Sequence, residues 1–183
     1  ETVTGHDRVV RDNVHRDIVL DDDISRLVDT RTFQRLRDVK QLATCHYVFP
    51  TATHTRFVHS LGAQHLAGIL LKHLETVNPG RISPEDARLV RFAALLHDIG
   101  HPPFSHALES DKVFATYHHH ETWGRKILED PDNDLRQVLL ELIGEDGLSR
   151  LFSILDGTCE PPVLHDIVSS QLDVDRLDYL MRD

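Results

Sequence analysis

The sequence has 183 residues, a length typical of one domain with a single hydrophobic core. Its apolar fraction is 40% and its charged fraction is 27%, which excludes a disordered or fibrous chain. Acidic residues outnumber basic ones by 30 to 20, and the net charge of −10 argues against a broad basic surface for duplex nucleic acid. An anionic ligand must therefore be bound by local cations or a metal.

Features that would direct the chain to a membrane or to secretion are absent from the sequence. No apolar run reaches the roughly 18 residues of a membrane span, and no apolar segment near the N-terminus resembles a signal peptide. Cys45 and Cys159 lack CxxC spacing and are too few for a disulfide scaffold. We therefore expect a cytoplasmic protein.

Apolar residues recur at helical spacing along most of the chain, beginning with Phe33, Leu36 and Val39. Ser83 and Pro84 form a typical helix start, with Ser83 as the N-cap, and Gly100 stands where that helix should stop. Strand patterns are confined to short stretches such as 18–20. The predicted helices cover residues 29–42, 59–77, 84 to about 100, 119–129, 133–143, 147–155 and 162–182. This pattern predicts an all-α bundle.

The two ends of the sequence suggest a longer natural protein. The chain begins at Glu1 without a methionine, and it ends at Asp183 inside the helical pattern DVDRLDYLMRD, with no glycine or proline to stop the helix. We therefore expect one domain over residues 1–183, with a further C-terminal region in the natural protein.

Histidine is abundant, at 14 residues, and clusters in HDIGHPPFSH, residues 97–106. An isolated histidine beside an apolar helix is usually a core or surface residue. Three histidines in one segment with Gly100 and two prolines instead favour a metal or acid/base site. His97 and Asp98 offer a nitrogen and an oxygen to a transition metal, and His59 and Asp175 are candidates to complete the set.

Five motifs follow one another in an order that resembles the HD-domain deoxynucleoside triphosphate triphosphohydrolases, the SAM-and-HD-domain enzyme and its prokaryotic relatives. They are FQRLRDVKQL, YVFPTATHTRFVHSLG, LLHDIGHPPFSH, HHHETWG and SSQLDVDRLDYLMRD, and VHRDIVL near the start is also similar. The resemblance implies an HD-domain helical bundle with a metal site between helices.

The resemblance places the four metal ligands of this family on His59, His97, Asp98 and Asp175. It implies that they bind a divalent transition metal, which is Mn, Fe, Ni, Zn or Co, with Mg²⁺ as an additional ion. These are the same four residues that the ligand chemistry of the sequence suggests.

Catalytic roles follow from the resemblance in the same way. His101 matches the histidine assigned to acid/base work, and its ordinary pKa of about 6.5 would let it protonate a leaving oxygen. His120 matches a second active-site histidine, and His106 matches the position that faces the phosphates. Glu109 stands where the animal enzyme carries an aspartate, the proposed partner of a catalytic histidine.

The resemblance also implies a set of substrate-binding residues. Two arginines would hold the phosphates together with His106, and three polar residues would read the sugar. Surface ion pairs are the competing interpretation for the arginines, and a core position is the competing one for the tyrosine. The six residues are Gln41, Arg56, His106, Arg176, Tyr179 and Asp183.

The implied reaction is the hydrolysis of a deoxynucleoside triphosphate to a deoxynucleoside and inorganic triphosphate, in a homo-oligomer without a membrane partner. The first alternative is an HD-type nucleotidase or phosphohydrolase that acts on nucleoside monophosphates or modified nucleotides. The second is a non-catalytic module that binds nucleotides or single-stranded nucleic acid. A complete metal-ligand set argues against the second alternative, and a substrate panel would separate the first from the implied reaction.

Overall fold

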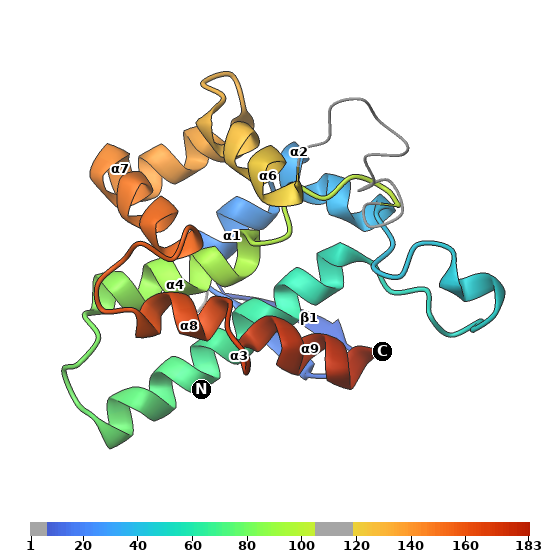
Figure 1. Ribbon diagram of the computed structural model, residues 1–183, viewed down its shortest axis with the longest axis horizontal. Helices are drawn as coiled ribbons and strands as arrows, with labels where there is room; N and C mark the ends of the chain where they lie inside the picture. The colour runs from blue at the N-terminus through green and yellow to red at the C-terminus, as the bar shows by residue number, and fades with distance from the viewer. Residues whose placement is uncertain (1–6, 105–118) are drawn as a thin grey trace.

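A computed structural model describes residues 7–104 and 119–183 of the chain, and these residues form a mostly helical bundle (Figure 1). The predicted helical class is confirmed, with one short hairpin added. The strands are β1 (Arg8–Asp12) and β2 (Arg16–Leu20), and the 3₁₀ helices are η1 (Arg35–Asp38) and η2 (Cys45–Tyr47). The α-helices are α1 (Asp22–Val28), α2 (Arg31–Gln34), α3 (Arg56–Val77), α4 (Pro84–Leu96), α6 (His120–Glu129), α7 (Asp134–Leu155), α8 (Val163–Val168) and α9 (Val174–Arg182).

Helix α3 is the centre of the bundle and packs against both α4 and α9. Ala63 and Ala67 on α3 are fully buried, as are Ala93 and Ala94 on α4, and such small side chains let two helices pack closely. Helix α4 also packs against α7 and α8 (Figure 1). No helix within residues 7–104 and 119–183 combines the length and the apolar character needed to cross a bilayer.

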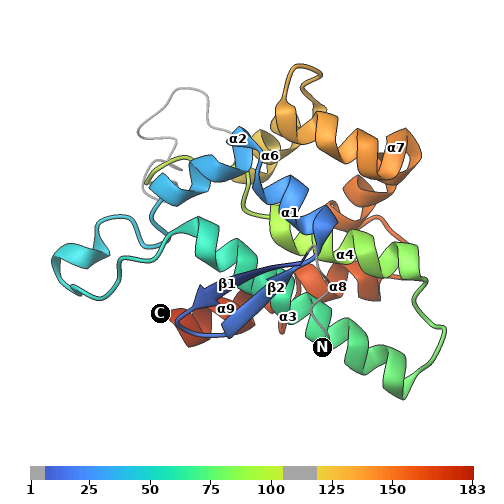
Figure 2. The same cartoon turned by 180° about the vertical axis from the view of Figure 1, so that it is seen from behind.

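The β1–β2 hairpin lies on the face of the molecule seen in Figure 2 and packs on α3 through β2. Its strands pair antiparallel from Arg8 opposite Leu20 to Asp12 opposite Arg16. The carboxylate of Asp12 accepts hydrogen bonds from the backbone N–H groups of Val14 and His15, at 2.9 and 2.8 Å, and so closes the turn. Part of β2 is the short strand stretch expected from the sequence.

The helix predicted over 29–42 is wrong in its extent, because the structure ends helical geometry at Asp38. Phe33, Leu36 and Val39 are all buried, but their spacing of three residues also suits the tighter 3₁₀ turn that follows α2. At Val39 the backbone becomes extended, and its carbonyl accepts the N–H of Arg56 at 2.8 Å. Pairing with the start of α3 therefore replaces the last predicted turns.

The helix predicted over 162–182 is two helices, α8 and α9, separated at Ser169–Asp173. The buried carboxylate of Asp173 accepts the N–H groups of Ser170 and Arg176, both at 2.7 Å, and therefore caps α9. The other predicted boundaries agree more closely. Ser83 caps α4 as expected, and Gly144 interrupts α7 between its two predicted segments with non-helical torsion angles.

Candidate active site

Four predicted metal ligands come together from three helices that are distant in sequence. His59 lies in the first turn of α3, and Asp175 lies in the first turn of α9. His97 and Asp98 follow the last residue of α4, where the chain turns. Because α4 and α9 both pack on α3, their ends bring these side chains to one point.

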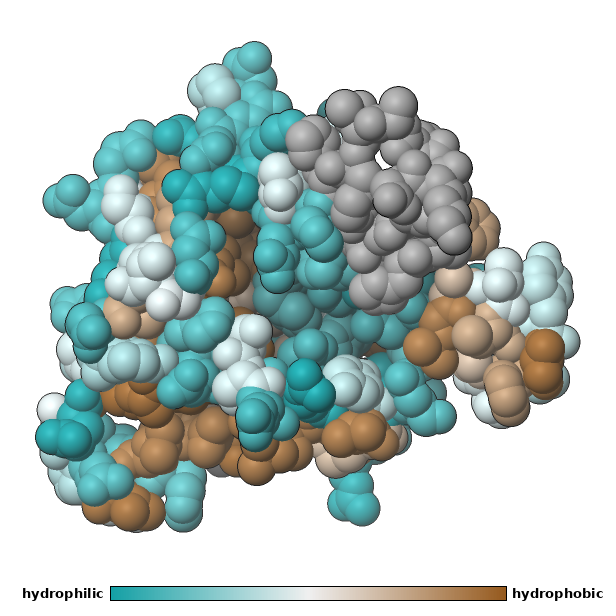
Figure 3. Space-filling view, in the orientation of Figure 1, coloured by the Kyte–Doolittle hydropathy of each residue, from teal (hydrophilic) through white to brown (hydrophobic). Residues whose placement is uncertain are grey.

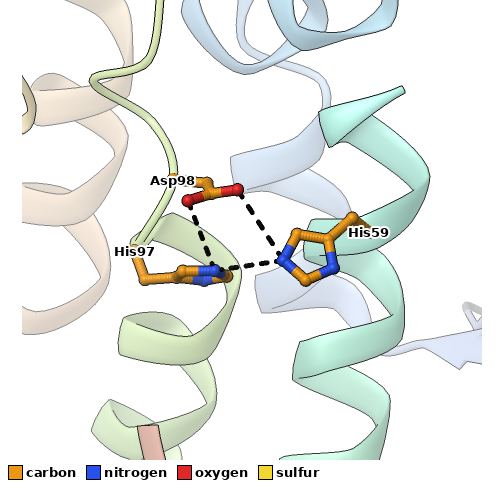
Figure 4. Close-up of side chains that lie close together, drawn as sticks. All are labelled: His59, His97 and Asp98. Atoms are coloured by element: carbon orange, nitrogen blue, oxygen red, sulfur yellow. Dashed lines mark hydrogen bonds and ion pairs between the residues drawn. The ribbon is translucent and has the colours of Figure 1, made fainter. Parts of the chain in front are cut away.

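The donor atoms of His59, His97 and Asp98 lie close enough to share one cation, and Asp175 contacts both histidines. The Nε2 atom of His59 is 3.3 Å from Nε2 of His97, 3.7 Å from Oδ2 of Asp98 and 2.9 Å from Oδ1 of Asp175. Figure 4 shows the first three of these side chains, whose donor atoms all lie within 4.8 Å of one another. Two imidazole nitrogens and two carboxylate oxygens are a donor set that divalent transition metals accept.

Both histidine rings of the cluster are held through the nitrogen that faces away from it. The Nδ1 atom of His97 is 2.8 Å from the carbonyl oxygen of Ala94, an acceptor that fixes Nδ1 as the protonated nitrogen. The Nδ1 atom of His59 is 2.7 Å from Oδ2 of Asp178. Both Nε2 atoms therefore face the shared point, which is the arrangement that a metal site requires. The residues present fit a divalent metal.

The pKa values of the cluster residues are shifted because histidines and aspartates of opposite charge lie next to one another in a buried part of the protein. Burial lowers the pKa of His59, but its hydrogen bonds to Asp175 and Asp178 outweigh this effect and raise the pKa to about 9. Burial raises the pKa of Asp98, but the charge of His97 and the hydrogen bond from His101 hold it well below its usual range. Both carboxylates of the cluster are therefore ionised at neutral pH, because the pKa of Asp175 is lowered as well.

Two further histidines stack beside the cluster. The Nε2 atom of His101 is 3.2 Å from Oδ1 of Asp98, and its ring lies on that of His120 with centroids 3.8 Å apart. Gly100 permits this stacking, because a methyl group there would lie 2.0 Å from the carbonyl oxygen of His120. Burial lowers the pKa of His101 to about 4, so its ring is neutral at pH 7 and does not keep the ordinary value assumed from the sequence.

Three residues of the cluster, His97, Asp98 and Asp175, line a cleft of about 530 Å³ between α6, α7, α8 and α9. The centre of the face in Figure 3 is hollowed and mostly hydrophilic. Arg56, Gln41 and Tyr179 line the cleft beside the two stacked histidines, and the guanidinium of Arg56 donates to Oδ2 of Asp98 at 2.5 Å. The lining also includes Glu121, Arg125, Phe152, Asp156 and His165. We call these five residues the outer wall of the cleft, and the lining residues of the cluster with their neighbours Gln41, Arg56, His101, His120 and Tyr179 the inner wall.

Comparison with known protein families matches residues 56–182 to the HD domain. The chain belongs to the HD domain family. The matched range begins with the first residue of α3 and ends with the last residue of α9, so it contains all four clustered donors.

Similar proteins share nearly the whole of this HD domain chain. An uncharacterized protein from Methanocaldococcus jannaschii is 38% identical over 96% of the chain, and a deoxynucleoside triphosphate triphosphohydrolase SAMHD1 homolog from Dictyostelium discoideum is 37% identical over 96%. The chain spans about a third of the length of these relatives, 33% and 36%. A phosphohydrolase structure from Bacteroides thetaiotaomicron superposes with a TM-score of 0.83 at 34% identity, covering 96% of this chain and 42% of the other.

Besides the buried His59, four of the residues expected at the active site are not part of the described cleft lining. The side chain of Arg176 is half exposed, and its Nε donates to the carbonyl oxygen of Ser170 at 3.1 Å. Asp183 lies at the end of α9, with Oδ1 3.0 Å from Nε2 of His54. His106 and Glu109 lie outside the described residues. The roles of these four, like those of the other expected site residues, stay predictions.

The sequence predicted no role for the residues that hold the HD domain cluster on the side facing away from the shared point. Asp178 contacts His59 and His15, and Arg182 joins Asp178 to Asp12. Arg35 donates to the backbone oxygens of Ile99 and His101, at 2.5 and 2.9 Å, and so holds the turn after α4. Asp178 follows Asp175 by three residues in DVDRLDYLMRD, so a helical reading of this motif could have placed the two aspartates on neighbouring positions of one face.

Proposed function

We propose that this HD domain is the catalytic domain of a metal-dependent phosphohydrolase that converts deoxynucleoside triphosphates to deoxynucleosides and inorganic triphosphate. The observation that carries the proposal is the convergence of His59, His97, Asp98 and Asp175, the last three of which line a cleft. Two further histidines line the same cleft. A nucleotide-sized ligand requires a pocket of several hundred Å³, and the volume of about 530 Å³ meets this requirement.

The four clustered residues would hold the divalent transition metal. When bound, such an ion lowers the pKa of water and neutralises charge on phosphoryl oxygens. His101 and His120 lie beside the cluster and line the cleft, so either ring could exchange a proton with a substrate or a water bound there. Arg56 is positioned to face a phosphate because its guanidinium lies at the cleft wall next to Asp98.

The choice of a deoxynucleoside triphosphate is supported by the relatives and by two cleft residues. The similar proteins include enzymes named deoxynucleoside triphosphate triphosphohydrolase, at 37% identity in Dictyostelium discoideum and 35% in Homo sapiens. Gln41 and Tyr179 provide an amide and a phenol at the cleft wall, groups that can bind a sugar hydroxyl. A Tyr179 ring packed beneath the sugar would leave little room for a ribose 2′-hydroxyl, so deoxynucleotides should be preferred.

One observation favours a second candidate, a nucleotidase that acts on nucleoside monophosphates. Among the described residues that line the cleft, the arginines are Arg56 and Arg125, and both are already paired, Arg56 with Asp98 at 2.5 Å and Arg125 with Asp156 at 2.8 Å. Arg176, the other arginine expected at the phosphates, lies away from this lining. A single phosphate needs fewer cations than a triphosphate, so this wall also suits the smaller substrate.

A turnover panel separates these activities. The protein would be incubated with each dNTP, NTP and dNMP in the presence of Mn²⁺, Mg²⁺, Fe²⁺ or Co²⁺, and the products would be separated by ion-exchange chromatography. We expect dNTPs to give deoxynucleoside and triphosphate. Hydrolysis of dNMPs with dNTPs left intact would select the nucleotidase, and metal binding without turnover of any nucleotide would select a binding module.

A further inference from the structure

Asp178 is a fully buried carboxylate that lies directly behind the candidate metal cluster without belonging to it. Its side chain is 0% exposed. Oδ2 is 2.7 Å from Nδ1 of His59 and accepts from Nε of Arg182 at 2.8 Å. Oδ1 is 2.6 Å from Nε2 of His15 and accepts from Nη2 of Arg182 at 2.9 Å. Each oxygen therefore has two nitrogen partners, and the carboxylate has one defined orientation.

A glycine on helix α3 leaves the space that the carboxylate of Asp178 occupies. Gly62 lies one turn after His59, and a methyl group built on Gly62 would stand 1.8 Å from Oδ1 of Asp178 and 2.6 Å from Nη2 of Arg182. Real Cβ atoms do not approach other atoms so closely. Any larger residue at this position would displace the carboxylate of Asp178 from its place beside His59. Glycine is therefore needed here for the contact between Asp178 and His59, because helix geometry itself does not require it.

The far side of the carboxylate is anchored to the hairpin. Arg182 also donates to Oδ2 of Asp12 at 2.8 Å, and Asp12 closes the turn that presents His15. The side chains of Arg182 and Asp12 are each only 5% exposed. Three segments, β1–β2, α3 and α9, therefore meet at Asp178, and the contact to His59 is held from both directions.

We propose that Asp178 is a positioning residue for the metal centre, which fixes the ring of His59 with Nδ1–H toward α9 and Nε2 toward the other ligands. This inference rests on the proposed metal-dependent function. Without a fixed acceptor at Nδ1, the imidazole could rotate or carry its proton on Nε2, and either change removes the nitrogen that a metal needs. The hydrogen bond to a carboxylate also makes Nε2 a more basic ligand.

Asp178 could alternatively serve only to hold the hairpin on α9 through Arg182. The two roles make different demands on metal affinity. A clamp that merely stabilises the fold would lower the free energy of unfolding and leave the dissociation constant of the metal unchanged. A positioning residue would change the metal dissociation constant more than stability alone accounts for.

The test uses two pairs of variants. Asp178→Asn keeps the shape of the side chain but removes its charge, and Arg182 keeps Asp12 as a partner in this variant. Its control is Asp134→Asn, because Asp134 joins α7 to α2 through Thr32 and the backbone of Arg31. Gly62→Ala displaces Asp178 without changing it, and its control is Gly68→Ala on the same helix, where an added methyl finds its nearest atom 3.7 Å away.

Each variant would be titrated with Mn²⁺ and Zn²⁺ against a competing chelator, with thermal unfolding and the visible spectrum of the Co²⁺ form measured alongside. We expect Asp178→Asn and Gly62→Ala to weaken metal binding by about 10-fold to 100-fold and to shift the Co²⁺ bands. Both controls should stay within about twofold of the wild type, because neither contacts a metal ligand.

Two results would overturn the inference while leaving the metal site in place. One is wild-type affinity and an unshifted Co²⁺ spectrum in the folded Asp178→Asn and Gly62→Ala proteins. The other is loss of folding in both variants with both controls folded, which would make Asp178 a structural residue. A wild-type protein that binds no metal would instead contradict the metal site and the proposed function themselves.

Discussion

The two walls of the cleft are built differently. On the inner wall, the side chain of Asp98 is 8% exposed, and that of His59, which contacts Asp98 but does not line the cleft, is 0% exposed. Both make hydrogen bonds to residues from other elements. On the outer wall, Arg125 is 37% exposed and Asp156 is 54% exposed, and they pair with each other. The guanidinium of Arg125 also lies 3.6 Å from the centre of the Phe152 ring.

This difference suggests how the two walls divide the work. Buried donors with fixed partners can hold a metal in one geometry, because moving any one of them would leave a charge buried and unpaired. Exposed ion pairs contribute little to stability and can exchange partners when a ligand arrives. We therefore expect the inner wall to determine the type of chemistry and, through Gln41 and Tyr179, the choice of sugar, and the outer wall to adapt to the rest of the nucleotide.

The largest expected effect comes from breaking the inner wall at Asp98. Asp98→Asn removes one ligand charge and the partner of Arg56, so the protein should lose nearly all of its metal, from about one equivalent in the wild type. Asp156→Asn changes a carboxylate of the outer wall and should leave metal content unchanged. Metal analysis after gel filtration measures both, and equal metal content in wild type and Asp98→Asn would show that the metal lies elsewhere.

A smaller effect, on catalytic rate alone, is expected when His101 is removed. His101→Ala should lower kcat by about 10²-fold to 10⁴-fold while metal content and KM stay near the wild-type values, because a positioned acid or base acts mainly in the transition state. His165→Ala removes a histidine of the outer wall and should change kcat by far less. Steady-state kinetics and metal analysis check the pair. Metal loss or unfolding in His101→Ala would make His101 structural.

A moderate effect on KM is expected for one of two arginines and not for the other. Arg56 lies at the cleft wall, whereas Arg176 is half exposed and bonded to a backbone carbonyl. Arg56→Ala should raise KM by about tenfold or more, since a hydrogen bond to a charged group contributes about 1.5–3 kcal/mol. Arg176→Ala should stay within about twofold. A rise in KM for Arg176→Ala as large as that for Arg56→Ala would contradict this comparison and support the phosphate role that the sequence resemblance implies for both arginines.

The smallest expected effect is on stability and depends on pH. Burial raises the pKa of Asp12, but hydrogen bonds from Arg182 and from two backbone N–H groups outweigh this effect and lower the pKa below the ordinary value of an aspartate. The stabilisation from a lowered pKa is complete above the unfolded-state pKa and is lost as the pH falls through the lower folded-state pKa. The difference in unfolding free energy between wild type and Asp12→Asn should therefore shrink as the pH falls below about 4, as urea titrations would show. A constant difference would contradict this account.

The sequence predicts helices well where local features define them. Ser83 and Pro84 mark the start of α4, and the structure places the cap as expected. The helix over 29–42 fails because the chain leaves it to pair with the start of α3, a contact between residues distant in sequence. The break before α9 depends on the side chain of Asp173, which resembles any other helical aspartate in sequence.

The same distinction applies to the site. Resemblance could assign His59, His97, Asp98 and Asp175 because their motifs are specific, and the structure brings them together. Asp178 carried no role in any motif, and its contacts become visible only when α3, α9 and the hairpin are assembled. The lowered pKa of His101 also arises from burial, which depends on the packing of α6 against the turn after α4.

The most direct test of the central claim is the turnover of a dNTP in ¹⁸O-labelled water, with products analysed by mass spectrometry. If the inner wall directs water to the α-phosphorus, the label should appear in inorganic triphosphate, and the deoxynucleoside should contain none. Label in the deoxynucleoside, or release of orthophosphate or pyrophosphate as the primary product, would contradict the proposed reaction.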